Sequence, residues 1–185
     1  WNAELGHGIS APPVTYEVNG VQYVWLLVGW GGTGASMVGS LAAQHGWAYK
    51  MHTRRVFTFA LDGKAQMPAS NPPFFPKPLA APDFKVDNKL PDQGSWLFKE
   101  SCAMCHCGGA VSGGYAPDLR ASPMTLDAKA FKDIVVNGQR LTLGMPAFKT
   151  LDEHKLETLR HYIRRQVGVP QILNAAQAED SKSGH

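Results

Sequence analysis

Seven prolines stand close together between residues 64 and 92, at positions 68, 72, 73, 76, 78, 82 and 91. Proline has no backbone N–H and a fixed φ, so this density forbids a helix and prevents pairing within a sheet. The stretch 64–92 is therefore predicted to be an extended, semi-rigid linker. Its aromatic residues Phe74, Phe75 and Phe84 favour a linker that lies along a neighbouring domain over a free tail.

The region before this linker, residues 1–63, has the composition of β structure. Val14–Val18 and Val21–Val28 are rich in β-branched and aromatic residues, and the Asn19-Gly20 pair between them is a strong hairpin signal. A further strand is predicted over Arg55–Leu61, ending in a turn. The segment Thr33–Thr53 is rich in Gly, Ala and Ser without a clear period, and it is predicted to be a long loop.

The region after the linker, residues 93–170, is predicted to be a compact helical domain. Gln93–Met104 can form its first helix, and Asp127–Asn137 can form another, with apolar residues at helical spacing. Thr150 and Glu153 form a capping box, in which the threonine hydroxyl accepts a hydrogen bond from the Glu153 amide. This box predicts the start of the last helix.

Composition and charge exclude several classes of function. The formal net charge of +3 is too small and too dispersed to argue for nucleic acid. The most apolar stretch, Val21–Gly29, has the length of a strand, so no membrane span is expected. Residues 171–185 are polar and are predicted to be a disordered tail. The chain opens on Trp1 without a secretory signal, so an interior fragment or a processed product is expected.

Three cysteines lie within six residues, too close together to connect distant parts of the chain by disulfides. Cys102-Ala-Met-Cys105-His106 instead has the C-x-x-C-H pattern of covalent haem attachment. Cysteines three apart on a helix share one face, so both sulfurs reach the vinyl groups on one porphyrin edge, and His106 becomes the proximal iron ligand. A thioredoxin-like motif would follow a strand, and a zinc site would need a second ligand pair. The pattern therefore predicts a class I cytochrome c domain that carries one covalent haem c and moves single electrons.

A sixth ligand closes the iron to oxygen, and methionine in this position raises the reduction potential. Met104 lies between the two attachment cysteines and cannot reach the opposite face. Met145 stands between Gly144, which permits close backbone approach, and Pro146, which stiffens the loop. Met145 is therefore the predicted ligand, with Met124 as the alternative.

Other residues near the motif have predicted roles in the haem pocket. The carbonyl of Pro117 can accept a hydrogen bond from the free ring nitrogen of His106. Arg120 can pair with a haem propionate, although an ordinary surface arginine is an alternative. Cys107 is interpreted as a small buried residue. The basic run from Arg160 to Arg165 either steers an acidic partner or complements the dipole of the last helix.

These motifs resemble the cytochrome domain of the quinohaemoprotein alcohol dehydrogenases. The matching segments are Cys102-Ala-Met-Cys-His106, Ser112-Gly-Gly, Ala116-Pro-Asp-Leu-Arg120, Gly144-Met-Pro-Ala-Phe148 and Leu159-Arg-His-Tyr-Ile-Arg164. Three segments of the first region resemble the end of that family's eight-bladed propeller: Ser10–Val24, Gly29-Trp-Gly-Gly32, and Arg55–Gly63, which looks like its last strand. The resemblance implies a mixed fold: a mainly α cytochrome c domain, preceded by a Pro-rich linker and a β fragment from the last blade or blades of a β-propeller.

In this family the propeller binds pyrroloquinoline quinone (PQQ) and calcium and oxidises an alcohol, and electrons then pass through the haem to an external acceptor. The resemblance implies a quinoprotein dehydrogenase domain or subunit as the donor, and a copper protein, a cytochrome or a quinone as the acceptor. Trp30 is expected either to contact the quinone or to be a packing residue of the propeller. The chain lacks most of the propeller, so alone it is not expected to oxidise alcohols, and no catalytic residue is predicted. Cys107 departs from this resemblance, because a small residue such as glycine is expected at this position in the family.

Two other interpretations remain open. A free-standing cytochrome c carrier or subunit would have no catalytic partner in its own chain. A haem enzyme or sensor would need an open coordination position, against which the Met145 ligand argues. Since covalent haem is installed outside the bacterial cytoplasm, a periplasmic location is expected in either case.

Overall fold

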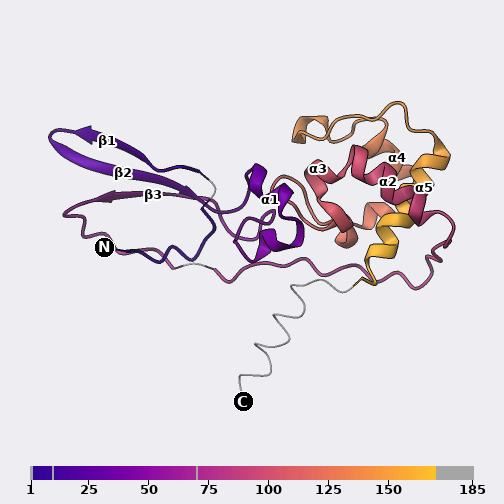
Figure 1. Ribbon diagram of the computed structural model, residues 1–185, viewed down its shortest axis with the longest axis horizontal. Helices are drawn as coiled ribbons and strands as arrows, with labels where there is room; N and C mark the ends of the chain where they lie inside the picture. The colour runs from indigo at the N-terminus through magenta and orange to yellow at the C-terminus, as the bar shows by residue number, and fades with distance from the viewer. Residues whose placement is uncertain (1, 10, 70, 170–185) are drawn as a thin grey trace, which may run out of the picture. The chain divides into compact units, whose positions relative to one another are not determined.

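The computed structural model describes residues 2–9, 11–69 and 71–169 of the chain (Figure 1). They divide into two compact units. Unit 1 comprises the described residues up to Phe75 together with Ser112–Pro117, and unit 2 comprises Pro76–Val111 and the residues from Asp118 onward. The predicted tail, 171–185, lies outside the described residues.

Unit 1 contains a three-stranded antiparallel sheet in the order β1-β2-β3. The strands are β1 (Val14–Val18), β2 (Val21–Val28) and β3 (Arg55–Ala60), close to the segments that the sequence predicts. Asn19 and Gly20 both have positive φ, 53° and 78°, as a two-residue hairpin turn requires. The turn sets the register, and the rings of the cross-strand pair Tyr16 and Tyr23 stack with centroids 5.3 Å apart. The hairpin and β3 are drawn as neighbouring arrows in Figure 1.

The prediction of a long loop over Thr33–Thr53 is wrong. This segment contains the short helix α1 (Thr33–Met37) and the 3-10 helix η1 (Gly39–Ala43). Both are built on small side chains, and Ala35 and Ala42 are almost completely buried in a core cluster that also includes Met51. The missing apolar period has a physical reason, because alanine can be buried on a close-packed surface without the long side chains that make a helix visibly amphipathic.

The described residues of the proline-rich stretch, 64–69 and 71–90, form turns and irregular backbone but no helix or strand. Phe75 packs against the unit 1 core cluster. The Phe84 ring lies tilted against the His161 ring in unit 2, with centroids 5.0 Å apart. The predicted end of the stretch needs correction, because Pro91 is the first residue of a helix. Proline is favoured at that position, where its missing N–H would have had no partner in the helix.

Unit 2 is helical. Its α-helices are α2 (Pro91–Ser101), α3 (Ala103–His106), α4 (Ala128–Val135) and α5 (Glu153–Gln166). Its 3-10 turns are η2 (Gly108–Ala110), η3 (Leu119–Ala121), η4 (Pro123–Leu126) and η5 (Leu141–Leu143). The single helix predicted over Gln93–Met104 is in fact two, because Cys102 leaves helical geometry with φ −121° and separates α2 from α3. The helix predicted over Asp127–Asn137 is confirmed as α4, with the Asp127 carboxylate capping the amide of Ala130.

The predicted capping box at Thr150 is wrong, because the N-cap of α5 is Asp152. Its carboxylate accepts a hydrogen bond from the Lys155 amide at 2.8 Å, and its backbone is extended, as an N-cap requires. Helix α5 therefore begins at Glu153, and that glutamate occupies the first turn, where a negative charge is favourable.

Helices α2 and α5 cross at Gly94. A β-carbon on this glycine would lie 2.4 Å from the Thr158 carbonyl oxygen and 2.6 Å from the Tyr162 β-carbon, so only glycine permits the crossing. Beside it, the Phe98 and Tyr162 rings pack with centroids 5.0 Å apart in the main core cluster of unit 2. Among the described residues, no helix combines the length and the apolar character that a membrane span needs.

Candidate haem-binding site

The predicted attachment motif lies at the junction of α2 and α3. Cys102 is half-buried at the end of α2, Cys105 is exposed on α3, and His106 is buried at 7% exposure. Backbone N–H groups of Cys105 and His106 both donate to the Cys102 carbonyl, at 3.2 and 2.9 Å. One tight helical turn therefore holds both cysteines and the histidine in a fixed order.

The chemistry of Cys102 fits a thioether. Burial, followed by the nearby Cys105, raises the pKa of the Cys102 thiol to about 12. A cysteine that binds zinc or exchanges disulfides works as a thiolate and sits where the pKa is lowered. A sulfur bonded to porphyrin carries no charge, so this half-buried position suits covalent haem attachment better than either alternative.

The chain turns sharply just after His106. Cys107 has φ 57° and ψ 164°, a conformation that glycine adopts far more readily than other residues. This geometry explains why a small residue such as glycine is expected here. The side chain of Cys107 is completely buried, in agreement with its interpretation as a small core residue.

The Met145 loop follows the turn η5. Gly144 ends that turn in the left-handed conformation with φ 90°, and the half-buried Met145 packs against the unit 2 core cluster. Its amide donates to the Arg140 carbonyl at 3.3 Å. Leu141 and Leu143, which precede this methionine in η5, remain 57% and 75% exposed.

The other two methionines near the motif have different surroundings. Met124 is half-buried in η4, and Met104 is 73% exposed. No distance in the structure assigns an axial ligand, so the choice of Met145 over Met124 stays a prediction.

Arg120 is not a surface residue. It is 6% exposed, and its Nε and Nη2 groups donate to the two carboxylate oxygens of Asp118 at 3.0 and 2.6 Å. Nη1 is buried and has no hydrogen-bond partner among the described residues. The Nη1 group can therefore donate a hydrogen bond to one more carboxylate, and a haem propionate could be that acceptor.

The sequence-based reasoning missed the role of Asp118. It lies two residues from Arg120 in the Ala-Pro-Asp-Leu-Arg segment, and this spacing was the available signal. Its carboxylate also accepts from the Arg120 amide, so it both orients and neutralises the arginine.

The basic run on α5 is mainly structural. Arg160 is buried and donates to the Thr125 and Leu126 carbonyls at 3.0 and 2.9 Å, while Arg165 pairs with Asp92. Arg164 is also buried, its Nη2 donates to the Leu79 carbonyl, and burial lowers the pKa of its guanidinium. Two of the arginines in this run are turned into the fold, which favours a structural role, and the steering of an acidic partner stays a prediction.

Trp30 belongs to unit 1 and is half-buried. The Arg54 guanidinium carbon lies 3.4 Å from the centre of the indole, and Tyr49 meets the ring edge-on with centroids 4.8 Å apart. The ring thus packs between a cation and an aromatic side chain, which suits the packing interpretation. Contact with a quinone remains a prediction.

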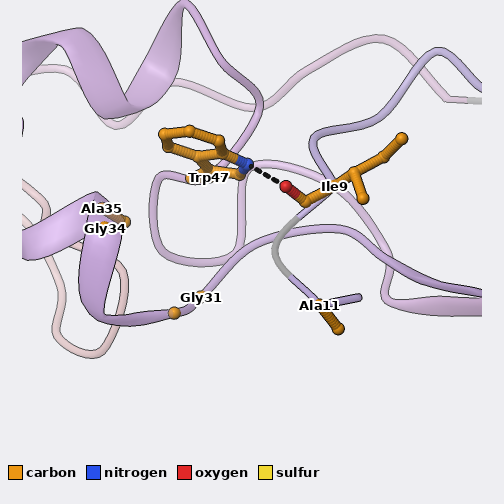
Figure 2. A pocket seen from close by; sticks show the side chains of 7 residues that line it. Ile9, Ala11, Gly31, Gly34, Ala35 and Trp47 are labelled. Atoms are coloured by element: carbon orange, nitrogen blue, oxygen red, sulfur yellow. Dashed lines mark hydrogen bonds between the residues drawn. The ribbon is translucent and has the colours of Figure 1, made fainter. Parts of the chain in front are cut away.

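Unit 1 also contains a cavity of about 320 Å³ next to Trp47 (Figure 2). The Trp47 indole N–H donates to the Ile9 carbonyl at 3.1 Å, as the dashed line in Figure 2 marks. The lining residues are Ile9, Ala11, Gly31, Gly32, Gly34, Ala35 and Trp47. Trp30 is next to Gly31 in the chain but is not one of them.

Comparison with known proteins identifies several similar sequences. Residues 89–163 match the family model described as cytochrome c oxidase, cbb3-type, subunit III. The dehydrogenase subunit of alcohol dehydrogenase (quinone) from Gluconobacter oxydans is 36% identical over 156 residues, which cover 84% of this chain and 20% of that protein. Quinohemoprotein alcohol dehydrogenase ADH IIB from Pseudomonas putida is 35% identical, over 88% of this chain and 23% of that protein.

A solved structure of the same kind of enzyme is also similar to this chain. Quinohemoprotein alcohol dehydrogenase ADHIIG from Pseudomonas putida HK5 superposes with a TM-score of 0.66 and 32% identity, covering 96% of this chain and 24% of that one. The chain thus spans about a fifth to a quarter of the length of these relatives. The second half of the chain is a cytochrome c domain that matches the C-terminal cytochrome portion of the quinohaemoprotein alcohol dehydrogenases.

Proposed function

We propose that this chain transfers single electrons through one haem c, bound by thioether bonds to Cys102 and Cys105. The observation that carries the proposal is the tight turn at the end of α2, which joins a half-buried thiol of raised pKa to a buried histidine. When bound, the haem supplies a reversible one-electron iron couple. His106 and Met145 are the proposed axial ligands.

The surrounding residues orient these groups and balance their charge. The Pro117 carbonyl is proposed to accept from the His106 ring, which makes the imidazole a stronger donor to iron. Arg120, already oriented by Asp118, is proposed to offer its vacant Nη1 to a propionate. The chain's own part in electron transfer is thus to hold the iron in fixed ligation that needs little rearrangement.

The similarity to the alcohol dehydrogenases supports a more specific role. Electrons are proposed to come from a dehydrogenase part with PQQ and calcium, where Trp30 contacts the quinone, and to leave to a copper protein, a cytochrome or a quinone. The proposed location is the periplasm. Alcohol oxidation is proposed only for the complete enzyme, because the relatives that carry this activity in their names are several times longer than this chain.

The first test is the denatured intact mass of the protein isolated from its source organism. A mass that equals this sequence plus one haem would establish covalent attachment and favour the free-standing carrier. A much larger mass with one haem would make these residues the end of a complete dehydrogenase. A protein without haem in either case contradicts the central proposal.

The three cysteines provide a matched set of variants for the attachment itself. The chain is produced in a host that installs c-type haem, and covalent haem is measured after acid–acetone extraction. Cys105→Ala should leave one thioether and shift the absorption of the reduced haem, because one vinyl group stays free. Cys107→Ala should retain wild-type attachment. Equal haem loss in both variants would contradict the assignment of the motif.

A further inference from the structure

The second half of the proline-rich stretch belongs to unit 2 and lies along helix α5. We call this segment, Pro76–Asp87, the strap. Leu79 makes its first contact: the Leu79 amide donates to the Arg120 carbonyl at 2.9 Å, and the Leu79 carbonyl accepts from Arg164 Nη2 at 2.6 Å. The backbone of this one residue therefore connects an arginine of the proposed haem pocket to the last helix.

The far end of the strap is held by two more residues. The Asp87 amide donates to Nδ1 of His161 at 3.0 Å, and the Phe84 ring lies against the same imidazole. The guanidinium carbon of Arg160 lies 5.4 Å from the centre of the Phe84 ring. Since residues three and four positions apart share a face of a helix, Arg164 lies on the same side of α5 as these two. The strap is thus fixed along one side of the last helix.

Arg164 depends on the strap for its hydrogen bonding. The residue is 6% exposed, and neither Nε nor Nη1 has a partner among the described residues. The Leu79 carbonyl is the one acceptor that the described part of the chain gives to this guanidinium. A buried charged group that loses its acceptor costs free energy, so detachment of the strap from α5 is unfavourable.

Prolines prepare the strap for this position. Pro76, Pro78 and Pro82 fix φ, so the segment is already extended and loses less conformational entropy when it packs than a flexible chain would. They also leave few backbone donors. Of the amides between Pro76 and Pro82, that of Leu79 alone makes a hydrogen bond among the described residues. The position of this part of the strap therefore depends on a single amide.

We propose that the strap is part of the haem pocket and that Leu79 is a positioning residue: its amide fixes the backbone of Arg120, and with it the guanidinium offered to a haem propionate. This inference rests on the proposed function, because it takes Arg120 to be the propionate partner. Asp118 accepts from the amide and from two side-chain nitrogens of Arg120. Leu79 holds the carbonyl, so the arginine is restrained on both sides of its α-carbon.

The direction of the effect on the reduction potential follows from charge. Oxidation of the haem iron adds a positive charge, which the positive guanidinium of Arg120 disfavours, so this arginine raises the potential. Loss of the Leu79 amide loosens Arg120 and weakens its contact with the propionate. The negative charge of the propionate is then less compensated, ferric iron is stabilised and the midpoint potential falls.

The test uses the haem-loaded full chain with Leu79→Pro. This change removes the amide that donates to Arg120 and keeps the carbonyl that accepts from Arg164. Two quantities are measured: the midpoint potential of the haem, and the hydrogen-exchange rate of the Arg120 amide, which donates to Asp118 at 2.9 Å. We expect this amide to exchange about tenfold faster and the potential to fall.

Ala80→Pro is the matched control. It places the same ring one residue later, at an exposed position whose amide makes no hydrogen bond among the described residues. Both quantities should keep their wild-type values. If Leu79→Pro yields no folded protein, Phe84→Ala loosens the strap without changing its charge and provides the same two measurements, with the same expected directions.

Faster exchange together with a lower potential supports the inference, and every other combination overturns it. Faster exchange at an unchanged potential, for example, would make Leu79 a structural residue only. The intact mass reports covalent haem separately. A wild-type chain without haem contradicts the proposed function, whereas a haem-loaded variant with an unaffected potential contradicts only the role of the strap.

Discussion

The residues that follow His106 adopt backbone conformations that side chains rarely take. Cys107 and Ala110 have φ of 57° and 60°, and between them Gly109 has φ of 77°. Such positions cost about 1–3 kcal/mol each when they are not glycine. The chain tolerates this strain directly beside the proposed iron ligand, where the turn away from α3 is needed.

Replacing Cys107 tests this strain. Cys107→Gly should be more stable than Cys107→Ala by about 1 kcal/mol, because glycine relieves the backbone while alanine keeps the strained φ. The free energy of unfolding from urea titrations of the two haem-loaded variants gives the comparison. A more stable alanine variant would show that side-chain burial outweighs backbone strain here.

The axial ligand is tested at Met145. Met145→Ala should abolish the methionine-to-iron absorption band and lower the reduction potential, because methionine ligation raises it. Met124→Ala is the control, since Met124 is half-buried like Met145 but lies in η4. Loss of the band in the Met124 variant alone would reverse the assignment.

At the scale of elements, the last helix depends on a cap that the sequence alone does not identify correctly. Thr150 and Asp152 both stand before α5, and both residue types are good N-caps. The N-cap is the residue directly before the first helical residue, and its backbone is extended. In the structure this residue is Asp152. The sequence alone therefore does not identify which of the two residues caps the helix.

Alanine substitutions separate the two candidates. Asp152→Ala should cost about 1 kcal/mol of stability, because the Lys155 amide loses its acceptor. Thr150→Ala should change the free energy of unfolding by less than about 0.5 kcal/mol. Urea titration monitored by far-UV circular dichroism measures both, and the opposite ranking would restore Thr150 as the cap.

A single substitution at Gly94 can test the close crossing of α2 and α5. Gly94→Ala should destabilise the domain by about 3 kcal/mol, because the new β-carbon meets backbone at 2.4 Å. Gln93→Ala, exposed on the same helix, should be neutral or slightly stabilising. Thermal unfolding followed at the haem absorption compares them, and a neutral Gly94 variant would contradict the close crossing.

Local signals in the sequence predict the elements that depend on local chemistry. Asn19-Gly20 needs only its own residues, and the structure shows the expected hairpin turn. The C-x-x-C-H segment is also local, but Cys102 divides the helix predicted there into two. The helices within Thr33–Thr53 were missed because buried alanines support them, without an amphipathic pattern. The place of Ser112–Pro117 in unit 1 depends on contacts with residues far away in the sequence, and only its pair of glycines, Gly113 and Gly114, hinted at close packing.

At the scale of the whole molecule, the two units differ in the chemistry that stabilises them. Unit 2 has a core of large apolar side chains, whereas the core of unit 1 is mostly alanine, and several β-strand residues such as Val14 and Val56 are about half exposed. Unit 1 also holds a close histidine pair, His7 and His52, with ring centroids 4.8 Å apart.

This pair makes unit 1 sensitive to acid. Burial, and then the neighbouring His7, lower the pKa of His52 below its ordinary value. The unfolded chain therefore binds the proton more readily than the folded one, so stability is full above about pH 6.5 and falls as the pH drops below it.

Urea titrations at about pH 7 and about pH 5, followed by tryptophan fluorescence, measure the effect. His52→Gln should reduce the loss of stability at the lower pH. His154 is exposed on α5, so His154→Gln serves as the control and should show the same loss of stability at the lower pH as the wild type. An unchanged pH dependence in the His52 variant would contradict the prediction.

The crossing at Gly94 also has a consequence for the order of events during synthesis. The ribosome completes α2 and the cysteines at its end long before α5 exists. Until Gln166 has been made, Gly94 and Phe98 lack the helix against which they pack. The two thiols thus belong to a chain whose helical domain closes only after α5 has been made.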